Sequence, residues 1–169
     1  MHNLALMARF NAWVNQRLYD AVASLPEEDY RRDRGLFFRS VHDTLNHILV
    51  VDRLWTGRVS GRDRGIRALD QRLQDDLSSL RAARETEDRD LIALVDGLTP
   101  AQLEQEQRYR PITAPGELSL RRDHMLMSLF NHQTHHRGQV TAALTQSGIK
   151  YADLDLPYFL AERRKAETN

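Results

Sequence analysis

Apolar residues recur every three or four positions along four long segments of this 169-residue chain. That spacing places one apolar stripe along each segment when the backbone is helical. It predicts helices over residues 4–25, 40–57, 68–98 and 122–147. Because no segment reads as a run of strands, the sequence predicts an all-α fold. The expected architecture is an antiparallel four-helix bundle that forms one domain over residues 1–169.

Capping signals set the expected limits of the second and third helices. Ser40, with Asp43 three residues later, is expected to begin the second helix, and Gly57 is expected to end it. Within the third helix, residues 81–90 are highly charged and poor in apolar side chains. This stretch is predicted to be a solvated face, with a frayed or kinked helix as a variant of that prediction.

A short helix and a loop are expected before the last long helix. Thr99 followed by Pro100 predicts a helical turn that ends near Glu104. A short irregular hairpin or loop is expected over residues 107–120, because this segment contains three breaking residues, Pro111, Pro115 and Gly116. Gly148 is expected to end the last long helix.

Composition narrows the classes of site and partner. The chain has no cysteine, which excludes a disulfide framework, a thiolate metal site and a cysteine nucleophile. Any metal site must therefore use histidine, aspartate or glutamate. The 24 basic residues balance the 24 acidic residues, so nucleic-acid binding is disfavoured. No apolar stretch resembles a signal peptide or a membrane span, so we expect a cytoplasmic protein with no membrane partner.

Two histidines interrupt the apolar stripe of the last long helix. His132 and His136 are four residues apart, so both imidazoles project from one helix face within reach of a single ion. A buried imidazole without a partner costs about 1 to 3 kcal/mol, so both are expected to have one. His47, in the middle of the second helix, is the best candidate for a third ligand. Three histidines and one open coordination position are typical of a catalytic zinc or nickel site.

The alternative interpretation of these three residues is a trio of hydrogen-bonded core histidines. The remaining histidines are not expected to be ligands: His2, His42, His124 and His135. Gln139 and Asn11 are candidates for orienting a ligand or water, and Asp43, one turn before His47, is a candidate for accepting a hydrogen bond from its imidazole. Asp43 also suits helix capping, and Asn11 also suits a structural tie in the core. Gly138, inside the last helix, indicates a close helix approach, room for a ligand or a tolerated glycine.

Two further features have both a functional and a structural interpretation. The segment 57–67 either cradles an anion or forms a solvated loop, because it contains four arginines, Arg58, Arg62, Arg64 and Arg67. Trp13 and Trp55 are expected to pack in the core or on a dimer surface rather than to stack on a substrate. The chain has no nucleophile elbow, P-loop, H-E-x-x-H or dinucleotide fingerprint, which removes serine hydrolases, nucleotide hydrolases and Rossmann enzymes.

Three stretches together resemble the DinB (damage-inducible) family: FNAWVNQRL near the start, TLNHILVVDRLW in the second helix and FNHQTHHRGQV in the last. They occur in the expected order over nearly the whole chain. The resemblance implies a four-helix bundle in which three histidines, here His47, His132 and His136, hold a divalent metal. The family is similar to mycothiol-dependent maleylpyruvate isomerases and bacillithiol transferases, in which the metal activates a low-molecular-weight thiol.

The leading hypothesis is a metal-dependent enzyme of the thiol S-transferase, isomerase or hydrolase type. It would use zinc or nickel, with a low-molecular-weight thiol as the cosubstrate that the resemblance implies. No motif identifies the small-molecule substrate, and a homodimer is expected because dimers are frequent among the relatives. The alternative is a noncatalytic, metal-stabilised stress-response binding module. A third hypothesis, a nucleic-acid contact through the arginine-rich segment, is opposed by the zero net charge.

Overall fold

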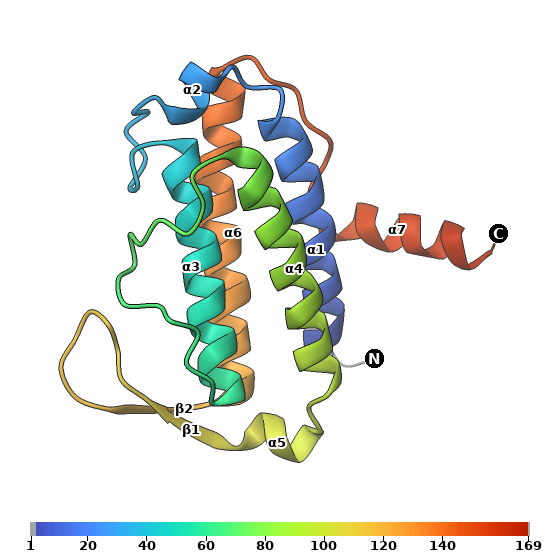
Figure 1. Cartoon of the computed structure of the whole chain (residues 1–169). Helices are drawn as coiled ribbons and strands as arrows, with labels where there is room; N and C mark the ends of the chain where they lie inside the picture. The colour runs from blue at the N-terminus through green and yellow to red at the C-terminus, as the bar shows by residue number, and fades with distance from the viewer. Residues whose placement is uncertain (1–2, 169) are drawn as a thin grey trace.

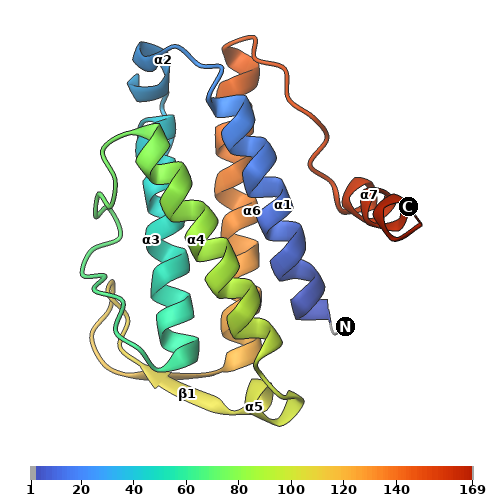
Figure 2. The ribbon, with the colours of Figure 1, turned by 45° about the vertical axis from the view of Figure 1, so that its right-hand side comes forward.

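Four long helices pack side by side in the computed structural model, which describes residues 3–168 (Figure 1). They are α1 (Asn3–Val22), α3 (Val41–Ser60), α4 (Leu77–Asp96) and α6 (Arg122–Gln146). Helices α3 and α1 each pack against both α4 and α6, which closes a four-helix bundle (Figure 2). The predicted all-α bundle is confirmed.

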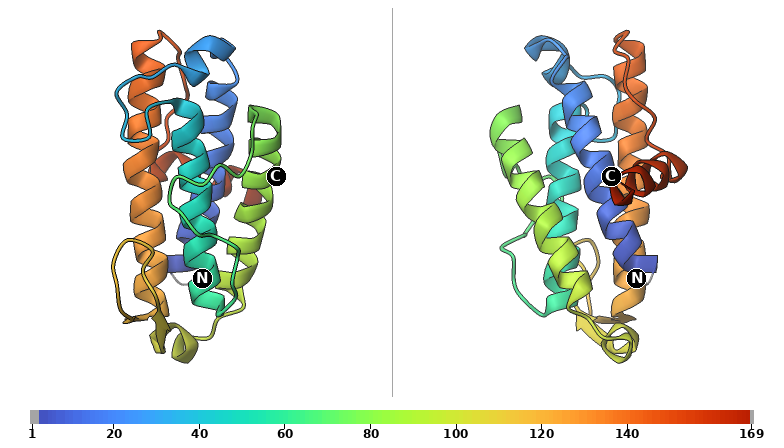
Figure 3. Two further views of the ribbon diagram at one scale, coloured as in Figure 1. Left: turned by 60° about the vertical axis from the view of Figure 1, so that its left-hand side comes forward. Right: turned by 90° about the vertical axis from the view of Figure 1, so that its right-hand side faces the viewer.

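Shorter elements cover the two ends and one side of the bundle. A hairpin of β1 (Glu106–Tyr109) and β2 (Leu118–Arg121) precedes α6, as predicted, with α2 (Glu27–Arg31) and α5 (Pro100–Glu104) at opposite ends. Helix α7 (Leu156–Glu167) extends away from the bundle and buries Phe159 against the rings of Phe10 and Trp13 (Figure 3). None of the helices within residues 3–168 combines the length and the apolar character that a transmembrane span requires.

The helix predicted over residues 68–98 is wrong in its first third. Helix α4 begins only at Leu77, where the Asp76 side chain accepts a hydrogen bond from the backbone N–H of Ser79. Residues 61–76 instead form a long crossover that runs back along the bundle (Figure 1). As a result α3 and α4 run in the same direction, and the antiparallel neighbours are α3 with α6 and α1 with α4 (Figure 3).

Asn46 on α3 explains why the crossover is not helical. Its Oδ1 accepts hydrogen bonds from the backbone N–H groups of Leu73 and Gln74, at 2.9 and 3.0 Å. Its Nδ2 donates to the Gln74 carbonyl oxygen at 3.1 Å. These bonds satisfy backbone groups that a helix would otherwise satisfy. Leu69 and Leu73 therefore reach the bundle from an irregular segment, although their spacing is typical of a helix.

The predicted N-terminus of α3 is confirmed, and its predicted C-terminus is wrong. The Ser40 side chain accepts a hydrogen bond from the Asp43 N–H at 3.0 Å, as the capping signal predicts. The helix does not stop at Gly57 but continues to Ser60, and Gly61 ends it with φ 69°. A Cβ at Gly57 would lie 2.6 Å from the Arg62 carbonyl oxygen. Gly57 is therefore needed for the crossover to turn back closely over the helix.

Buried apolar side chains form two clusters, one toward each end of the bundle, and all four long helices contribute to both. Between the clusters lies a layer of buried polar side chains, which we call the polar layer. Its members come from the middle of the same helices: Asn11, Asn15, Asp52, Thr56, Arg84, Glu87, Asp88, Gln133 and Arg137. The bundle is thus held by two apolar cores and by paired charges between them.

The prediction that residues 81–90 form a solvated face is wrong for three of its charged side chains. Arg84, Glu87 and Asp88 are only 2%, 1% and 7% exposed. Arg84 pairs with Asp52 of α3 at 2.5 Å and with Asp88 at 2.9 Å. These side chains can be buried because charges of opposite sign lie beside them, some of them on a neighbouring helix.

His42 is a buried core histidine with satisfied ring nitrogens, in line with its expected structural role. Its Nδ1–H donates to the Tyr30 hydroxyl oxygen at 2.8 Å, and its Nε2 accepts from Asn46 Nδ2 at 3.3 Å. A second ring proton would oppose the Asn46 amide donor. Burial lowers the pKa of His42 from its ordinary value of 6.5, and the nearby Arg31 charge lowers it further. His42 is therefore neutral in the folded chain at neutral pH.

Replacing His42 with glutamine is expected to make folding less sensitive to acid. Because the folded-state pKa lies below the unfolded value, the unfolded chain takes up the proton first as the pH falls. The stability contributed by neutral His42 is present above about pH 6.5 and is lost as the pH falls below it. Urea unfolding at about pH 7.5 and pH 5.5 should show a larger loss of unfolding free energy in wild type than in H42Q. Equal losses would contradict this, and the exposed H124Q should behave as wild type.

Candidate metal centre

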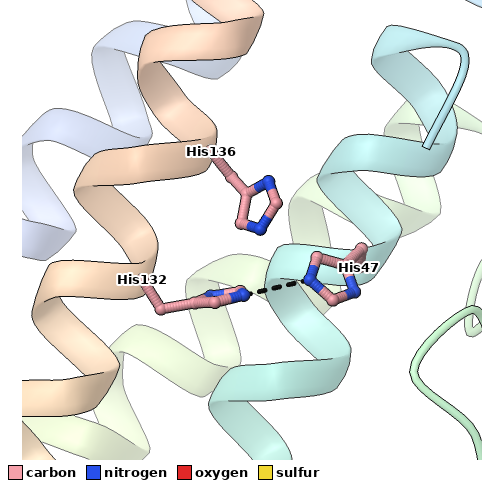
Figure 4. Close-up of side chains that lie close together, drawn as sticks. All are labelled: His47, His132 and His136. Carbon is pink, nitrogen blue, oxygen red and sulfur yellow. Dashed lines mark hydrogen bonds between the residues drawn. The ribbon is translucent and has the colours of Figure 1, made fainter. Parts of the chain in front are cut away.

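The bundle brings His47 of α3 against His132 and His136 of α6 (Figure 4). His132 and His136 lie one helical turn apart, and His47 faces them from the neighbouring antiparallel helix. One ligand nitrogen from each residue lies within 4.8 Å of the other two. Nε2 of His47 and Nε2 of His132 lie 3.0 Å apart. All three residues proposed from the sequence therefore share one site.

Hydrogen bonds on the outer ring nitrogens orient two of the imidazoles. His47 Nδ1–H donates to the Leu69 carbonyl oxygen of the crossover at 2.8 Å. His136 Nδ1–H donates to Gln139 Oε1 at 3.0 Å. Each bond leaves Nε2 as the ring nitrogen with a free lone pair. A carbonyl or amide oxygen on the far nitrogen is the arrangement that fixes a metal-ligating histidine.

His132 has a polar atom that nothing in the described chain satisfies. Its Nδ1 is buried and has no hydrogen-bond partner among residues 3–168. If His47 Nε2 is an acceptor, the 3.0 Å approach of His132 Nε2 requires either a proton or a cation between the two nitrogens. A cation would satisfy both lone pairs at once. A shared proton would pair only His47 with His132, whereas a cation would accept a lone pair from all three imidazoles, whose ligand nitrogens lie within 4.8 Å of one another. The grouping of three donors therefore favours a metal over a purely hydrogen-bonded trio.

The electrostatic environment keeps the three imidazoles neutral. Burial lowers the pKa of His47 to about 4, although its bond to the Leu69 carbonyl opposes this effect, and burial lowers the pKa of His132 to about 3. The neighbouring His136 lowers both pKa values further. Burial also lowers the pKa of His136, although its bond to Gln139 opposes this effect. Neutral imidazole is the form that binds a metal. Three neutral nitrogen donors without a thiolate or carboxylate fit a divalent ion such as zinc or nickel.

The site opens into a cavity of about 590 Å³ between α3, α6 and the loop of the β-hairpin. Phe38 stacks on the His47 ring at 3.7 Å between centroids and holds that ring in place. The remaining walls are mainly apolar and aromatic, and they include Val51, Leu54 and Trp55. No aspartate or glutamate of the described residues lines this cavity. A volume of this size fits a small organic molecule beside the histidines.

The supporting residues proposed from the sequence have different outcomes. Gln139 accepts a hydrogen bond from His136 instead of the proposed ligand or water. Asp43 does not reach His47, because it caps α3 through Ser40 and pairs with Arg72. Asn11 lies in the polar layer, where its Oδ1 accepts from Arg137 at 2.8 Å, so it is the structural tie. A Cβ at Gly138 would meet nothing within 4 Å, so the predicted close helix approach is wrong, and Gly138 does not line the histidine cavity.

The other histidines lie outside the cluster, with one at its edge. His124 is exposed near the start of α6, and His2 lies outside the described residues. His135 is exposed, as expected, but it lines the cavity and its ring lies 4.7 Å from that of His136. His135 is therefore the one titratable imidazole of the described chain that borders the cavity without belonging to the cluster.

Two supporting groups could not be found from spacing. The Leu69 carbonyl and the Phe38 ring both act on His47, yet they come from segments 22 and 9 positions away that are not helical. A backbone carbonyl carries no sequence signal, and a phenylalanine in a connecting segment resembles any apolar anchor. Only the path of the crossover and of the segment before α3 places them.

Replacing Gln139 with leucine is expected to weaken zinc binding about 10- to 100-fold, because His136 Nδ1 loses the oxygen that orients its ring. Competition with a chromogenic zinc chelator would measure the change. The matched control is Q146L, the same substitution at an exposed position of the same helix. Equal zinc affinities for Q139L and Q146L would contradict the orienting role.

Comparisons with known proteins agree with the fold and the sequence. The sequence profile of the DinB family matches residues 1–167. Protein DinB of Bacillus subtilis (strain 168) is 27% identical over 165 residues, an alignment that covers 93% of this chain and 94% of that protein. Crystal structures of DinB-like proteins from Bacillus subtilis and Bacillus cereus ATCC 10987 each give a TM-score of 0.64 at 15% identity. The matches cover 88% and 83% of this chain, and 97% and 90% of those chains.

The two crystal structures support the fold alone, since their sequences are distant from this one. The profile match extends over nearly all of the sequence and includes the three stretches that resemble the family. The chain belongs to the DinB family.

Proposed function

We propose that this protein is a metal-dependent enzyme that activates a low-molecular-weight thiol at the three-histidine site for transfer or isomerisation. The observation that carries the proposal is the convergence of three neutral imidazoles within 4.8 Å at the wall of an apolar cavity. Three protein ligands leave one coordination position for a reacting group, which is typical of a catalytic rather than a structural site. Zinc or nickel is the expected ion.

A bound ion would supply Lewis acidity that lowers the pKa of a thiol or of water. The residues of the chain orient the ligands and shape the cavity. Leu69 and Gln139 fix the tautomers of His47 and His136, so the ligand nitrogens are ready without rearrangement. Phe38, Val51 and Leu54 exclude water from the reacting side of the cavity.

Thiol activation fits the cavity better than hydrolysis does. Hydrolytic metal sites commonly add a glutamate as general base, and no carboxylate of the described chain lines this cavity. A thiol needs less assistance, because its ordinary pKa of about 8.5 is already close to neutral. His135, at the cavity edge, is the side chain available to accept the proton.

Elemental analysis of protein purified without a nickel column tests the first part of the proposal. We expect close to one zinc or nickel ion per chain. The metal-loaded protein would then be assayed with bacillithiol, mycothiol and glutathione against a chromogenic electrophile. Turnover that disappears on chelation and returns with the metal would support the proposal. A chain that takes up no metal even after incubation with zinc would contradict it and leave three core histidines.

The second candidate is a noncatalytic, metal-stabilised binding module. The absence of a carboxylate from the cavity wall, within the part of the chain described, is the observation that favours it. A metal that binds only the folded state at 100 times its Kd would raise the unfolding free energy by about 2.7 kcal/mol. Stoichiometric metal and this stabilisation, without turnover of any thiol, would favour the module over the enzyme.

We also propose a homodimer. Helix α7 extends from the bundle and buries a single side chain, Phe159, in the isolated chain, while Tyr158 is 49% exposed. A helix with so little buried surface is stabilised by packing against a partner. Sedimentation equilibrium of the metal-loaded protein measures the state directly.

A further inference from the structure

Arg58, near the end of α3, is a half-buried arginine without an acidic partner among residues 3–168. Its Cζ lies 4.6 Å from the centre of the Trp55 ring and 4.3 Å from that of Tyr109. In the described chain, its guanidinium makes one hydrogen bond, a long one of 3.4 Å to the Arg110 carbonyl oxygen. A guanidinium has five N–H donors, so most of them have no protein acceptor. Contact with two rings uses none of these donors.

Arg58 lines the same cavity as the three histidines. No carboxylate of the described residues lines that cavity, and Glu87, a buried acid on α4, is already paired with Arg53 and Arg64. With a divalent ion on neutral histidines, the cavity would carry positive charge at two places and negative charge at none. An unpaired half-buried charge is costly, and an anionic ligand removes that cost.

A second cavity of about 790 Å³ lies on the other side of Arg58 and Tyr109, which line both cavities. Seven arginines and one carboxylate, Asp63, line this second cavity, which we call the basic hollow. Arg62 and Arg110 have no ion pair within the described part of the chain. The arginine-rich segment 57–67 therefore lines a concave surface. Its field attracts small anions toward Arg58.

The helical geometry of α3 gives the separation between the histidine site and Arg58. His47, Val51, Trp55 and Arg58 all line the cavity, so they share one face of the helix. His47 and Arg58 are eleven residues apart, which is about 16 Å along the axis between their Cα atoms. A long side chain on a helix leans toward the N-terminal turn, here toward Trp55 and the histidines. A ligand that touches both ends needs an elongated apolar body.

We propose that the ligand of the three-histidine cavity is an organic anion with an apolar body, and that Arg58 binds its carboxylate or phosphate group. The inference rests on the proposed function, since it places the anion in the same cavity as the metal. The planar guanidinium forms two parallel hydrogen bonds with either acid group. Val51, Leu54 and Trp55 contact the apolar body between the two ends. Arg58 is thus the residue that determines specificity for an acidic substrate.

A structural role for Arg58 makes a different prediction. If Arg58 only fastens the hairpin to α3 through Trp55 and Tyr109, its replacement changes stability and leaves the preference for anions unchanged. The preference for an acid over its neutral amide is therefore the informative measurement. Phenylbutyrate and phenylbutyramide have the same apolar body and nearly the same shape, and they differ in charge.

Isothermal titration of the zinc-loaded protein with these two probes tests the proposal. We expect phenylbutyrate to bind about ten-fold or more tightly than phenylbutyramide. In R58Q the acid should bind no more tightly than the amide. R58K keeps the positive charge but lacks the paired N–H donors of the guanidinium, so it should retain part of the preference. The control is R62Q, which removes a charge from the basic hollow but not from the histidine cavity, and it should retain the preference.

Equal binding of acid and amide to wild type would overturn the proposal, and so would an undiminished preference in R58Q. Urea unfolding of each variant identifies any that fails to fold, and if R58Q is unfolded, a full wild-type preference in R58K overturns the proposal. Phenylpropyl phosphate, added as a third probe, shows by its affinity relative to phenylbutyrate whether the acid group is a phosphate or a carboxylate.

Repeating the titration after chelation separates this inference from the proposed function. An acid preference that depends on Arg58 and persists without metal supports the anion site even if no metal is found in the purified protein. A preference that follows the metal and ignores Arg58 assigns the anion to the ion and overturns the inference.

Discussion

Replacing His132 with leucine is expected to abolish stoichiometric metal binding. The loss should exceed the roughly 10- to 100-fold effect of removing an outer hydrogen-bond partner, because a direct ligand is lost. Leucine fills a similar volume and offers no lone pair, so a water molecule cannot easily take the vacated place. Elemental analysis and competition with a zinc chelator measure the result.

The same variant is expected to fold well without metal. In the metal-free wild type, His132 Nδ1 is buried with no partner among the described residues, and such a group costs about 1 to 3 kcal/mol. Removing it should leave the metal-free protein at least as stable as metal-free wild type in urea unfolding. The control is H124L at an exposed position on the same helix, which should keep its metal. Wild-type zinc content in H132L would show that His132 is not a ligand.

Replacing Arg84 with methionine is expected to destabilise the fold by about 3 to 5 kcal/mol, because the substitution leaves buried acids without their counter-ion. Arg84 is 2% exposed and pairs with both Asp52 and Asp88. Urea unfolding, with the m value checked for constancy, measures the cost. The control is R89M, the same substitution at an exposed position of α4, which should change stability by about 0.5 kcal/mol or less.

The cost of R84M should depend on pH in a defined direction. Burial raises the pKa of Asp52 from 3.8 to about 7, and the charge of Arg84 opposes that rise. Without Arg84 the folded-state pKa of Asp52 rises further above its unfolded value. A carboxyl group with a raised folded-state pKa destabilises the fold as the pH increases and the group ionises. R84M should therefore be closer to wild type at about pH 5 than at about pH 8, and the opposite order would contradict this account.

The polar layer also connects stability to the histidine site. Gln133 and Arg137 directly follow His132 and His136 on α6, and they face the layer while the histidines face the cavity. Gln133 Nε2 donates to Asp52, and Arg137 donates to Asn11. These bonds fix the orientation of α6 about its helix axis. The polar layer therefore helps to point His132 and His136 toward His47.

Much of the fold could be predicted because its signals are local. The Ser40 cap, the Thr99 capping box and Gly148 with φ 70° each act within a few residues of the chain. The i, i+4 spacing of His132 and His136 likewise places both rings on one face as soon as α6 forms. The apolar stripes, the helix caps and the histidine spacing all depend on backbone geometry over one or two helical turns. For this reason the sequence alone predicts the helical bundle and the pairing of His132 with His136 on one face.

Contacts between distant segments could not be predicted in this way. The helix predicted from residue 68 fails because Asn46 holds a crossover whose leucines have helical spacing. The local pattern predicts a solvated face for residues 81–90 because the counter-ion Asp52 of Arg84 lies about 30 positions earlier in the chain. The local sequence around a charged residue does not show whether a distant counter-ion will lie beside it in the core.

The sequence by itself determined the helices, their buried stripes and the two histidines on one face of α6, because these depend on interactions within a few residues. Only the tertiary structure decided that α3 and α4 run in the same direction, that Leu69 orients His47, and that Arg58 lies between two rings beside a cavity without carboxylates. Those features arise where segments far apart in the chain meet, and the free energy that selects them comes from packing and charge pairing across the bundle.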